Sequence, residues 1–435
     1  MTAPLPIDEA DRKAIAAAVA ENFDAETSFL ADFVRIPSQR FEEGPAQDFI
    51  AAALRARGYE VDDWKIELDD LKDLKGFGPI EGDFSRARTV VGSHRPDVVK
   101  GRSLILQGHL DVVPVGPLEM WETPPYEPAI KDGWMNGRGA GDMKAGTVCA
   151  LFALDALRSA GFEPAAPVFF QSVIEEESTG LGALSTLQRG YRADAALLPE
   201  PTGHRFSNAQ VGVLWFKLKV RGKPVHVSVA GEGSNAIMAS FEVLKKLSAL
   251  QEEWNARKGD DPVWKDVPHP LNFNAGKIQG GDWASSVPAW CDVDCRIGVL
   301  PGFDLDKCKQ EIVDCVAAAA RENPFLANNP PEVVWNGFQA EGWVLENGEE
   351  LHEVLSTAYS DVFEGEMMEL RSSTALTDTR FYELYYDIPA VCFGPKALNV
   401  HGFDEKVELA SMQKVTETIA LFIARWCGLN KIEAA

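Results

Sequence analysis

Disulfide chemistry has little support in this sequence. Its 435 residues include seven cysteines, an odd number, and no two of them form a Cys-x-x-Cys pair. A disulfide framework is therefore not expected. Cys291 and Cys295 lie four apart in a strand-like run with no further metal ligands nearby, and we interpret them as buried core thiols.

Positive charge and long apolar segments are also scarce. The chain has 42 Lys and Arg against 66 Asp and Glu, a formal net charge of -24, so it lacks the basic footprint of a protein that binds nucleic acid or an anionic membrane. The N-terminus, M-T-A-P-L-P-I-D-E-A-D-R, shows no basic region followed by an apolar stretch. No segment approaches the length of a membrane span. The sequence thus predicts a cytoplasmic protein without a nucleic-acid or membrane partner.

The residues that are present, 46% hydrophobic and 25% charged, have a globular profile, and the length favours two domains. Strands alternate with helices along the first part of the chain, which predicts an α/β domain with a mainly parallel sheet. The expected helices cover residues 8–35, 43–58, 145–160 and 182–189, and the expected strands 103–114, 167–174 and 193–198.

The pattern changes near residue 211. Strands are expected at 211–221, 272–279, 287–299 and 332–336, with helices at 235–258 and 305–323. This β-α-β-β-α-β order is that of the ferredoxin-like unit. The chain then returns to the first domain with a helix at 347–363, a strand at 388–393 and a helix at 406–426. We therefore predict one domain from residues 1–210 and 339–435, interrupted by a second from 211–338.

The residues of the first domain that are suited to catalysis or metal binding follow its buried strands, where open α/β sheets place their ligands. His109 and Asp111 come first, in G-H-L-D. Residues two apart on a strand face the same way, so the Asp111 carboxylate can accept the second imidazole N–H of a metal-bound His109. A histidine at a strand end bonded to its neighbour explains this pair equally simply, and for the pair alone we favour that simpler interpretation.

Asp142 lies in the glycine-rich loop G-R-G-A-G-D-M-K-A-G. Such a loop can cradle a phosphate, but this one lacks both the P-loop ending and the dinucleotide spacing. Three adjacent glutamates, residues 175–177, follow a hydrophobic strand directly. Charge runs are usually solvated loops, yet adjacent carboxylates beside a divalent cation can ionise together. One glutamate would coordinate, and another would take the proton of an attacking water.

Five ordered motifs together resemble the M20 family of metallopeptidases and deacylases, which includes acetylornithine deacetylase and succinyl-diaminopimelate desuccinylase. They are H-L-D-V-V-P, G-R-G-A-G-D-M-K, E-E-E-S-T-G, P-E-P-T and a late His-x-x-x-Glu, and W-E-T-P-P-Y-E-P also resembles a family loop. The resemblance implies a catalytic domain with two metal ions, interrupted by a ferredoxin-like lid that dimerises.

Carried over to this chain, the resemblance assigns the metal ligands. One ion would be held by His109 and Glu200, the other by Glu177 and His401, with Asp142 bridging both. Glu176 would be the general base, Asp111 would orient His109, and Glu175 would flank the site without coordinating. The resemblance also implies a cis peptide bond between Asp142 and Met143.

In the lid, G-K-P-V-H-V-S and C-R-I-G-V-L-P-G resemble family segments that contact substrate. They imply that His226 reaches the scissile carbonyl in the partner subunit's site and that Arg296 binds a substrate carboxylate; Asn235 is a further candidate for substrate binding. Relatives often have asparagine where this chain has Ser285 and Ser286, and glycine where it has Lys396. These differences are expected to reshape the substrate pocket.

The sequence therefore predicts a homodimeric, metal-dependent hydrolase that cleaves an amide bond, foremost in an N-acyl amino acid. Two zinc ions are expected, although cobalt and manganese accept the same ligands. Two alternatives remain: an exopeptidase or dipeptidase of the same family acting on a dipeptide-like substrate, and a non-catalytic dimeric binding protein that keeps the fold.

Overall fold

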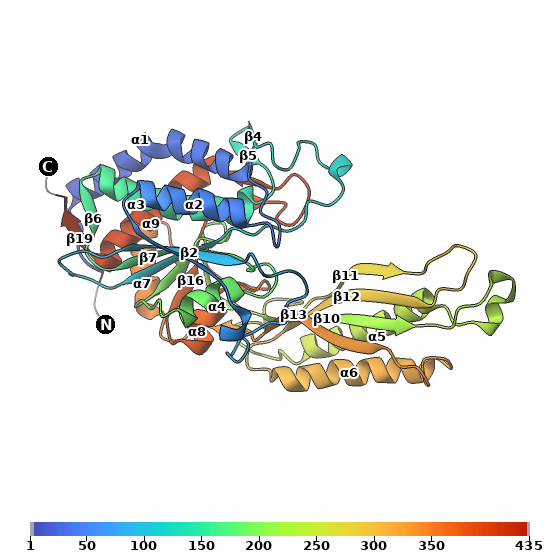
Figure 1. The fold of residues 1–435 in the computed structure, drawn as a ribbon. Helices are drawn as coiled ribbons and strands as arrows, with labels where there is room; N and C mark the ends of the chain where they lie inside the picture. The colour runs from blue at the N-terminus through green and yellow to red at the C-terminus, as the bar shows by residue number, and fades with distance from the viewer. Residues whose placement is uncertain (1–3, 433–435) are drawn as a thin grey trace.

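A mixed sheet forms the centre of the larger part of the protein (Figure 1). The computed structural model describes residues 4–432. The strand order of the sheet is β1-β2-β7-β3-β8-β16-β9-β14, and β15 also pairs with β9. The strands are β1 Glu60–Lys65, β2 Arg88–His94, β3 Leu104–His109, β7 Val168–Val173, β8 Ala196–Leu198, β9 Phe206–Gln210, β14 Trp343–Val344, β15 Leu370–Ser373 and β16 Ala390–Cys392.

The predicted parallel arrangement is found at the centre of this sheet, where β7, β3, β8 and β16 are parallel neighbours. The flanks are mainly antiparallel: β1 with β2, β2 with β7, and β9 with β16 and β14, although β15 runs parallel to β9. Parallel neighbours need a long crossover, usually a helix. No α-helix lies between β1 and β2, which is consistent with their antiparallel pairing.

Helices cover both faces of the sheet (Figure 1). One face packs against α1 Glu9–Val34, α2 Gly44–Ala56, α3 Ala145–Ser159, α7 Glu349–Val362 and α9 Leu409–Cys427. The other packs against α4 Leu181–Gln188, α8 Thr379–Tyr385 and the irregular segment 66–87. Two small sheets complete this part: β4 Ala129–Lys131, β5 Trp134–Asn136, β17 Ala397–Leu398 and β18 Lys406–Glu408, and the pair β6 Phe162–Pro164 and β19 Leu429–Lys431.

The insertion, defined as the elements from β10 to β13, extends away from the large sheet (Figure 1). Its strands are β10 Gly212–Arg221, β11 Phe273–Gly280, β12 Trp290–Val299 and β13 Glu332–Ala340, in the antiparallel order β11-β12-β10-β13, and its helices are α5 Ala236–Ala256 and α6 Leu305–Glu322. The alternating burial of β10 and β12 turns one face onto these helices and makes a separate hydrophobic core. This is the β-α-β-β-α-β order expected from the sequence.

Short helical segments lie in the connections: η1 Leu68–Asp70, η2 Leu118–Met120, η3 Ala140–Lys144 and η4 Val227–Glu232. The seven cysteines are all free, and Cys291 and Cys295 are buried in the core of the insertion, as expected. No helix within residues 4–432 combines the length and the apolar character needed to cross a membrane.

Glu26 is a fully buried carboxyl group among α1, α3 and α9. It accepts a hydrogen bond of 2.6 Å from Thr416 Oγ1, while its Oε2 has no partner within the described part of the chain. Burial raises the pKa of Glu26 from 4.5 to about 8. Below pH 4.5 the carboxyl is protonated in both states; above it the unfolded chain releases the proton first, so stability falls until the pH reaches about 8.

We therefore predict that Glu26 lowers the free energy of unfolding by up to about 1.4 kcal/mol per pH unit across this window. The Glu26→Gln variant lacks the titrating proton, so the wild-type protein should lose stability relative to it between pH 5 and 8. Urea unfolding of both proteins at several pH values measures this difference, in which all other titrating groups cancel. Parallel pH profiles would contradict the prediction.

Candidate active site

Six chemically active side chains, contributed by separate segments of the chain, gather at one place. His109 ends β3, Glu176 and Glu177 follow β7, and Glu200 follows β8. These positions are at the carboxyl ends of parallel strands, where the sheet topology brings sequence-distant side chains together. Asp142 in η3 and His401 after β17 complete the group, which we call the carboxylate–histidine cluster.

Asp142 lies between the two histidines. Its Oδ1 is 3.2 Å from His109 Nε2, and its Oδ2 is 3.4 Å from His401 Nε2. On the first side, Glu200 Oε2 lies 4.0 Å from His109 Nε2. On the second side, Glu177 Oε1 lies 3.0 Å from His401 Nε2. Each oxygen of one carboxylate thus faces a separate histidine and a separate glutamate.

These residues form overlapping groups that could hold metal ions. One is His109, Asp142 and Glu200, another is Asp142, Glu177 and His401, and a third is His109, Glu176 and Glu177; within each, the candidate ligand atoms lie within 4.8 Å of one another. The first two groups share Asp142. Imidazole nitrogen and carboxylate oxygen are ligands that zinc, cobalt and manganese accept.

The electrostatics of the cluster also fit divalent ions. Burial raises the pKa of Glu200 well above its ordinary value, and Glu200 Oε1 has no hydrogen-bond partner among the described residues. Burial likewise raises the pKa of Glu177, and the Glu177 carboxylate is the main cause that raises the pKa of His401 to about 11. A bound cation favours the ionised carboxylates and the neutral imidazole, and so counteracts the raised pKa values of the glutamates and of His401.

The loop that carries Asp142 is held by residues to which the sequence analysis gave no role. Glu405 accepts hydrogen bonds from the backbone N–H groups of Gly139, Gly141 and Asp142 at 2.8–3.0 Å, and from Arg138 Nη1 at 2.6 Å. The peptide bond between Asp142 and Met143 is cis, which confirms that expectation. Glu405 is the last residue of the His-x-x-x-Glu motif, so its spacing was a signal that could have identified it.

Lys144 fastens the other end of the same loop. Its buried ammonium donates to the carbonyl oxygens of Phe33 at 3.1 Å and Ile36 at 2.8 Å, where α1 ends. Cations stabilise the carbonyl end of a helix. The position of Asp142 therefore depends on α1 as well as on Glu405.

Asp111 differs in part from its expected geometry. His109 Nδ1 lies 2.9 Å from the backbone carbonyl oxygen of Asp111 but 3.6 Å from its carboxylate Oδ1. The carboxylate also accepts hydrogen bonds from the backbone N–H groups of Glu176 at 3.3 Å and Glu177 at 3.1 Å. The Asp111 carboxylate therefore lies beside the imidazole, as expected, but the shortest contact with His109 Nδ1 is made by the main chain. The side chain of Asp111 also fixes the turn that carries the glutamates.

Glu175 is directed away from the cluster, and its charge is balanced by Arg40. The Arg40 guanidinium donates to both carboxylate oxygens, at 2.5 and 2.9 Å, and Thr179 Oγ1 donates at 2.8 Å. Its backbone has a positive φ of 66°, which directs this residue apart from its neighbours. Like charges in the E-E-E run are thus separated because one glutamate has a half-buried cationic partner of its own.

The predicted substrate-binding residues of the insertion do not meet the cluster within one chain. His226 is exposed, with its Nδ1 2.8 Å from Ser228 Oγ, and its backbone pairs with that of Ser286, next to Ser285. Figure 1 shows the loop after β10 at the end of the insertion remote from the large sheet. Asn235 caps α5, because its Oδ1 accepts the N–H of Met238 at 3.0 Å.

Arg296 and Lys396 also lie outside the cluster. Arg296 is half-buried on β12, opposite Trp215 of β10 and Asn274 of β11, and burial lowers its pKa. Lys396 Nζ lies 3.4 Å from Glu408, and its backbone N–H donates to Ser411.

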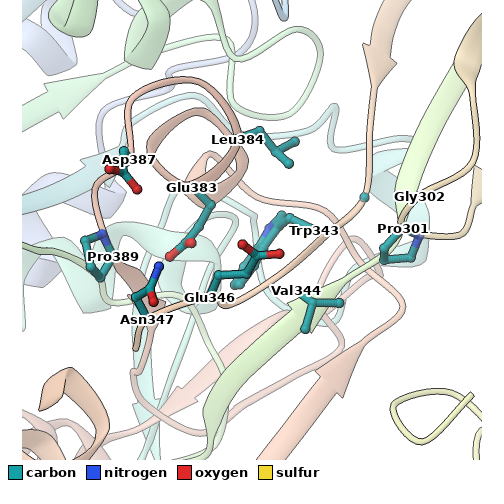
Figure 2. A pocket seen from close by; sticks show the side chains of 11 residues that line it. Pro301, Gly302, Trp343, Val344, Glu346, Asn347, Glu383, Leu384, Asp387 and Pro389 are labelled. Carbon is teal, nitrogen blue, oxygen red and sulfur yellow. The ribbon is translucent and has the colours of Figure 1, made fainter. Parts of the chain in front are cut away.

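A cavity of about 660 Å³ opens at the base of the insertion (Figure 2). Its lining includes Pro301 and Val344 together with Glu346, Glu383 and Asp387. None of the cluster residues lines it. The cavity is therefore separate from the candidate active site.

Comparisons with known proteins agree with this arrangement. The family model of peptidase family M20/M25/M40 matches residues 105–425. The chain is 29% identical to the N-formyl-4-amino-5-aminomethyl-2-methylpyrimidine deformylase of Bacillus subtilis, over 91% of this chain and 92% of that protein. It is 27% identical to the protein of the same name from Halalkalibacterium halodurans, over 89% and 90%. The di-peptidase Dug1p of Saccharomyces cerevisiae has a similar fold, with a TM-score of 0.79, 16% identity, and coverage of 96% of this chain and 98% of that one.

The Arg40–Glu175 pair predicts a measurable loss of stability. Arg40→Met leaves a carboxylate with no exposed side-chain surface and no cationic partner, whereas Arg40 itself is 29% exposed. We expect the free energy of unfolding to fall by about 3 kcal/mol, at the low end for broken buried pairs. Arg40→Met combined with Glu175→Gln should lose less, because no unpaired charge remains. Equal losses in the single and double variants, measured by urea unfolding, would contradict this interpretation.

Proposed function

The chain belongs to peptidase family M20/M25/M40 and is a hydrolase, and we propose that it removes the acyl group from N-acyl amino acids with the help of two divalent ions. The observation that carries this proposal is the position of the Asp142 carboxylate, with one oxygen toward His109 and the other toward His401. That geometry suits a carboxylate that bridges two ions.

We assign the ligands accordingly. His109 and Glu200 would hold one ion, Glu177 and His401 the other, and Asp142 both. Zinc is the first choice for this set, with cobalt and manganese as alternatives. When bound, the ions would polarise the amide carbonyl and lower the pKa of a water molecule so that it becomes a nucleophile.

Glu176 is the proposed general base. Its Oε2 lies 3.9 Å from His109 Nε2, and its backbone is held by the Asp111 carboxylate, so the side chain is fixed beside the ligands. It would accept the proton of the attacking water and return it to the amine nitrogen that leaves. Glu175 does not compete for this role, because Arg40 occupies both of its oxygens.

Deacylation of an amino acid is supported by two observations. The deformylases named above are similar over about nine-tenths of both chains, and their name describes removal of an acyl group from an amine. Within the described residues, the half-buried Arg296 has no ion pair, so its guanidinium is available for a substrate carboxylate. Dipeptide hydrolysis is the second candidate, because the family model that matches the chain is that of a peptidase family. The likeness to Dug1p, at 16% identity, shows the fold alone.

We further propose that residues 1–210 and 339–435 form the catalytic domain, that 211–338 form a lid, and that the lid dimerises. β11 is the exposed edge of its sheet. The surface beside it carries exposed apolar side chains, namely Met238, Phe241, Ile278 and Trp283. A second copy that covers this edge would satisfy the open backbone groups and bury the apolar surface. Seven free cysteines support a reducing, cytoplasmic setting.

Substitution of the three glutamates one at a time tests the mechanism. Glu176→Gln should lower turnover by at least about 10²–10⁴-fold while both ions remain bound, because only the base is removed. Glu177→Gln should lower the metal content, and Glu175→Gln should have a milder effect on turnover. The measurements are kcat on N-acetyl and N-formyl amino acids and on dipeptides, with elemental analysis of each variant.

Two results would overturn the proposal. Near-normal turnover in Glu176→Gln would show that the base is another residue. Full activity in metal-free protein, unchanged by added chelators, would contradict the two-ion mechanism. A preference for dipeptides over acyl-amino acids would select the second candidate.

His226 tests the dimer and the lid together. If it donates a hydrogen bond to the oxyanion in the partner's site, His226→Ala should lower kcat by about 10²–10³-fold without loss of metal. Mixing inactive His226→Ala and Glu176→Gln chains should then restore part of the activity, because some heterodimers contain one complete site. Confirmed subunit exchange without recovery would show that His226 does not act across an interface.

A further inference from the structure

The turn that carries Glu176 is braced by a second arginine, Arg380, on α8. Its Nη2 donates to the carbonyl oxygen of Thr179 at 2.7 Å. Thr179 in turn donates through Oγ1 to Glu175, the residue before Glu176. Arg40 and Arg380 therefore hold the same turn from two directions.

Arg380 is unusual because its charge is almost completely enclosed. The side chain is 1% exposed, and its Nε and Nη1 have no hydrogen-bond partner among residues 4–432. Enclosing a guanidinium costs free energy unless other interactions offset the loss of water. The buried carboxylates of Asp378 and Glu176 attract it electrostatically. Packing of the turn alone does not require so costly a residue.

Two aromatic rings face Arg380, and one of them comes from the base of the insertion. The Cζ of Arg380 lies 4.0 Å from the ring centroid of Phe381 on α8 and 5.2 Å from that of Phe338 on β13. Trp215 on β10 meets Phe338 edge to face, with centroids 5.2 Å apart. β10 and β13 are the first and last strands of the insertion, and thus connect it to the large sheet. A movement of the insertion at its base would therefore reach Phe338 and Arg380.

α8 makes a further contact with the same base. Tyr385, at the end of α8, donates to Glu341 Oε2 at 2.8 Å, directly after β13. Glu383 and Leu384 of α8 line the cavity beside this contact (Figure 2). The short helix α8 thus contacts Thr179 near its start and the base of the insertion at its end. The cavity beside it leaves room for side chains to move.

Segment 66–87 adds a parallel connection. Gly337 on β13 donates its backbone N–H to the carbonyl oxygen of Pro79 at 2.9 Å, and Lys217 on β10 pairs with Glu81 at 2.7 Å. Gly78 lies so close to the Gly337 carbonyl and Thr179 that a β-carbon at this position would meet the carbonyl oxygen at 2.4 Å. Thr179 is therefore the point at which both connections to the insertion converge.

We propose that Arg380 is a positioning residue that couples the placement of the insertion to the placement of Glu176, through the carbonyl oxygen of Thr179. This inference rests on the proposed role of Glu176 as the base. Closure of the insertion over a substrate would shift Phe338 against Arg380 and adjust the turn, so that the base reaches its working position when the site is closed. Substrate binding does not require this adjustment, whereas the proton transfer does.

Kinetics of Arg380→Lys provide the first test. Displacing the base slightly should lower kcat by about 10- to 100-fold, while KM stays within about twofold because the substrate contacts are intact. Metal content and the thermal midpoint should remain close to those of the wild-type protein. A raised KM with unchanged kcat would overturn the proposal and assign Arg380 to substrate binding instead. Wild-type kcat and KM would also overturn it.

A double-mutant cycle separates coupling from simple bracing. Phe338→Leu removes the insertion's ring from Arg380 and leaves the ring of Phe381 in place. Arg40→Lys is the matched control, because Arg40 braces the same turn through Glu175. For Arg380→Lys combined with Phe338→Leu, we expect the fold loss in kcat of the double variant to be smaller than the product of the two single losses. For Arg40→Lys combined with Phe338→Leu, we expect the fold loss of the double variant to equal that product. Multiplication in both pairs would overturn the coupling.

Two further results keep the test decisive. If Arg380→Lys does not fold, Phe338→Leu alone should still lower kcat with little change in KM, and wild-type kinetics in that variant would overturn the proposal. Glu176→Gln serves as the reference: if it is fully active, the proposed function fails. If it is inactive while Arg380→Lys and Phe338→Leu behave as wild type, only the coupling fails.

Discussion

The candidate active site depends on one carboxylate shared between two imidazoles. Asp142 can face both His109 and His401 only if its backbone is held in an unusual loop. Glu405 supplies that restraint by accepting hydrogen bonds from three backbone N–H groups of the loop, and Lys144 ties the loop to the end of α1. In a metal site of this kind, the placement of the ligand atoms therefore depends on the hydrogen bonds around them.

Charge separation is the second requirement. Three consecutive glutamates repel each other, yet each has a different environment: Glu175 binds Arg40, Glu176 lies beside His109, and Glu177 faces His401. The Asp111 carboxylate, which could have added to the repulsion, is occupied by two backbone N–H groups of the same turn. The negative charge that remains is directed toward the place where two cations would be bound.

The two parts of the protein have different tasks in this arrangement. The large sheet brings candidate ligands together at its carboxyl edge, whereas the insertion carries Arg296 on a separate sheet with its own core and His226 in the loop after β10. Communication between them must pass through the few strands and loops at the base of the insertion. Arg380, Phe338 and segment 66–87 lie at that passage, which explains why a buried guanidinium has a place there.

The sequence by itself determined the central βα units, the ferredoxin-like insertion and the identity of the candidate ligands, because buried strands, helices and ordered motifs leave local patterns. It did not reveal β1, β2, β9 or β15, since these strands lie beside irregular segments and their residues show no clear period. Nor did it reveal that the Asp111 side chain binds the backbone of Glu176 and Glu177, or that Glu405, Lys144 and Arg380 secure the site. Those roles join residues dozens to hundreds of positions apart, and only the tertiary structure decides which distant backbone groups a buried charge will meet.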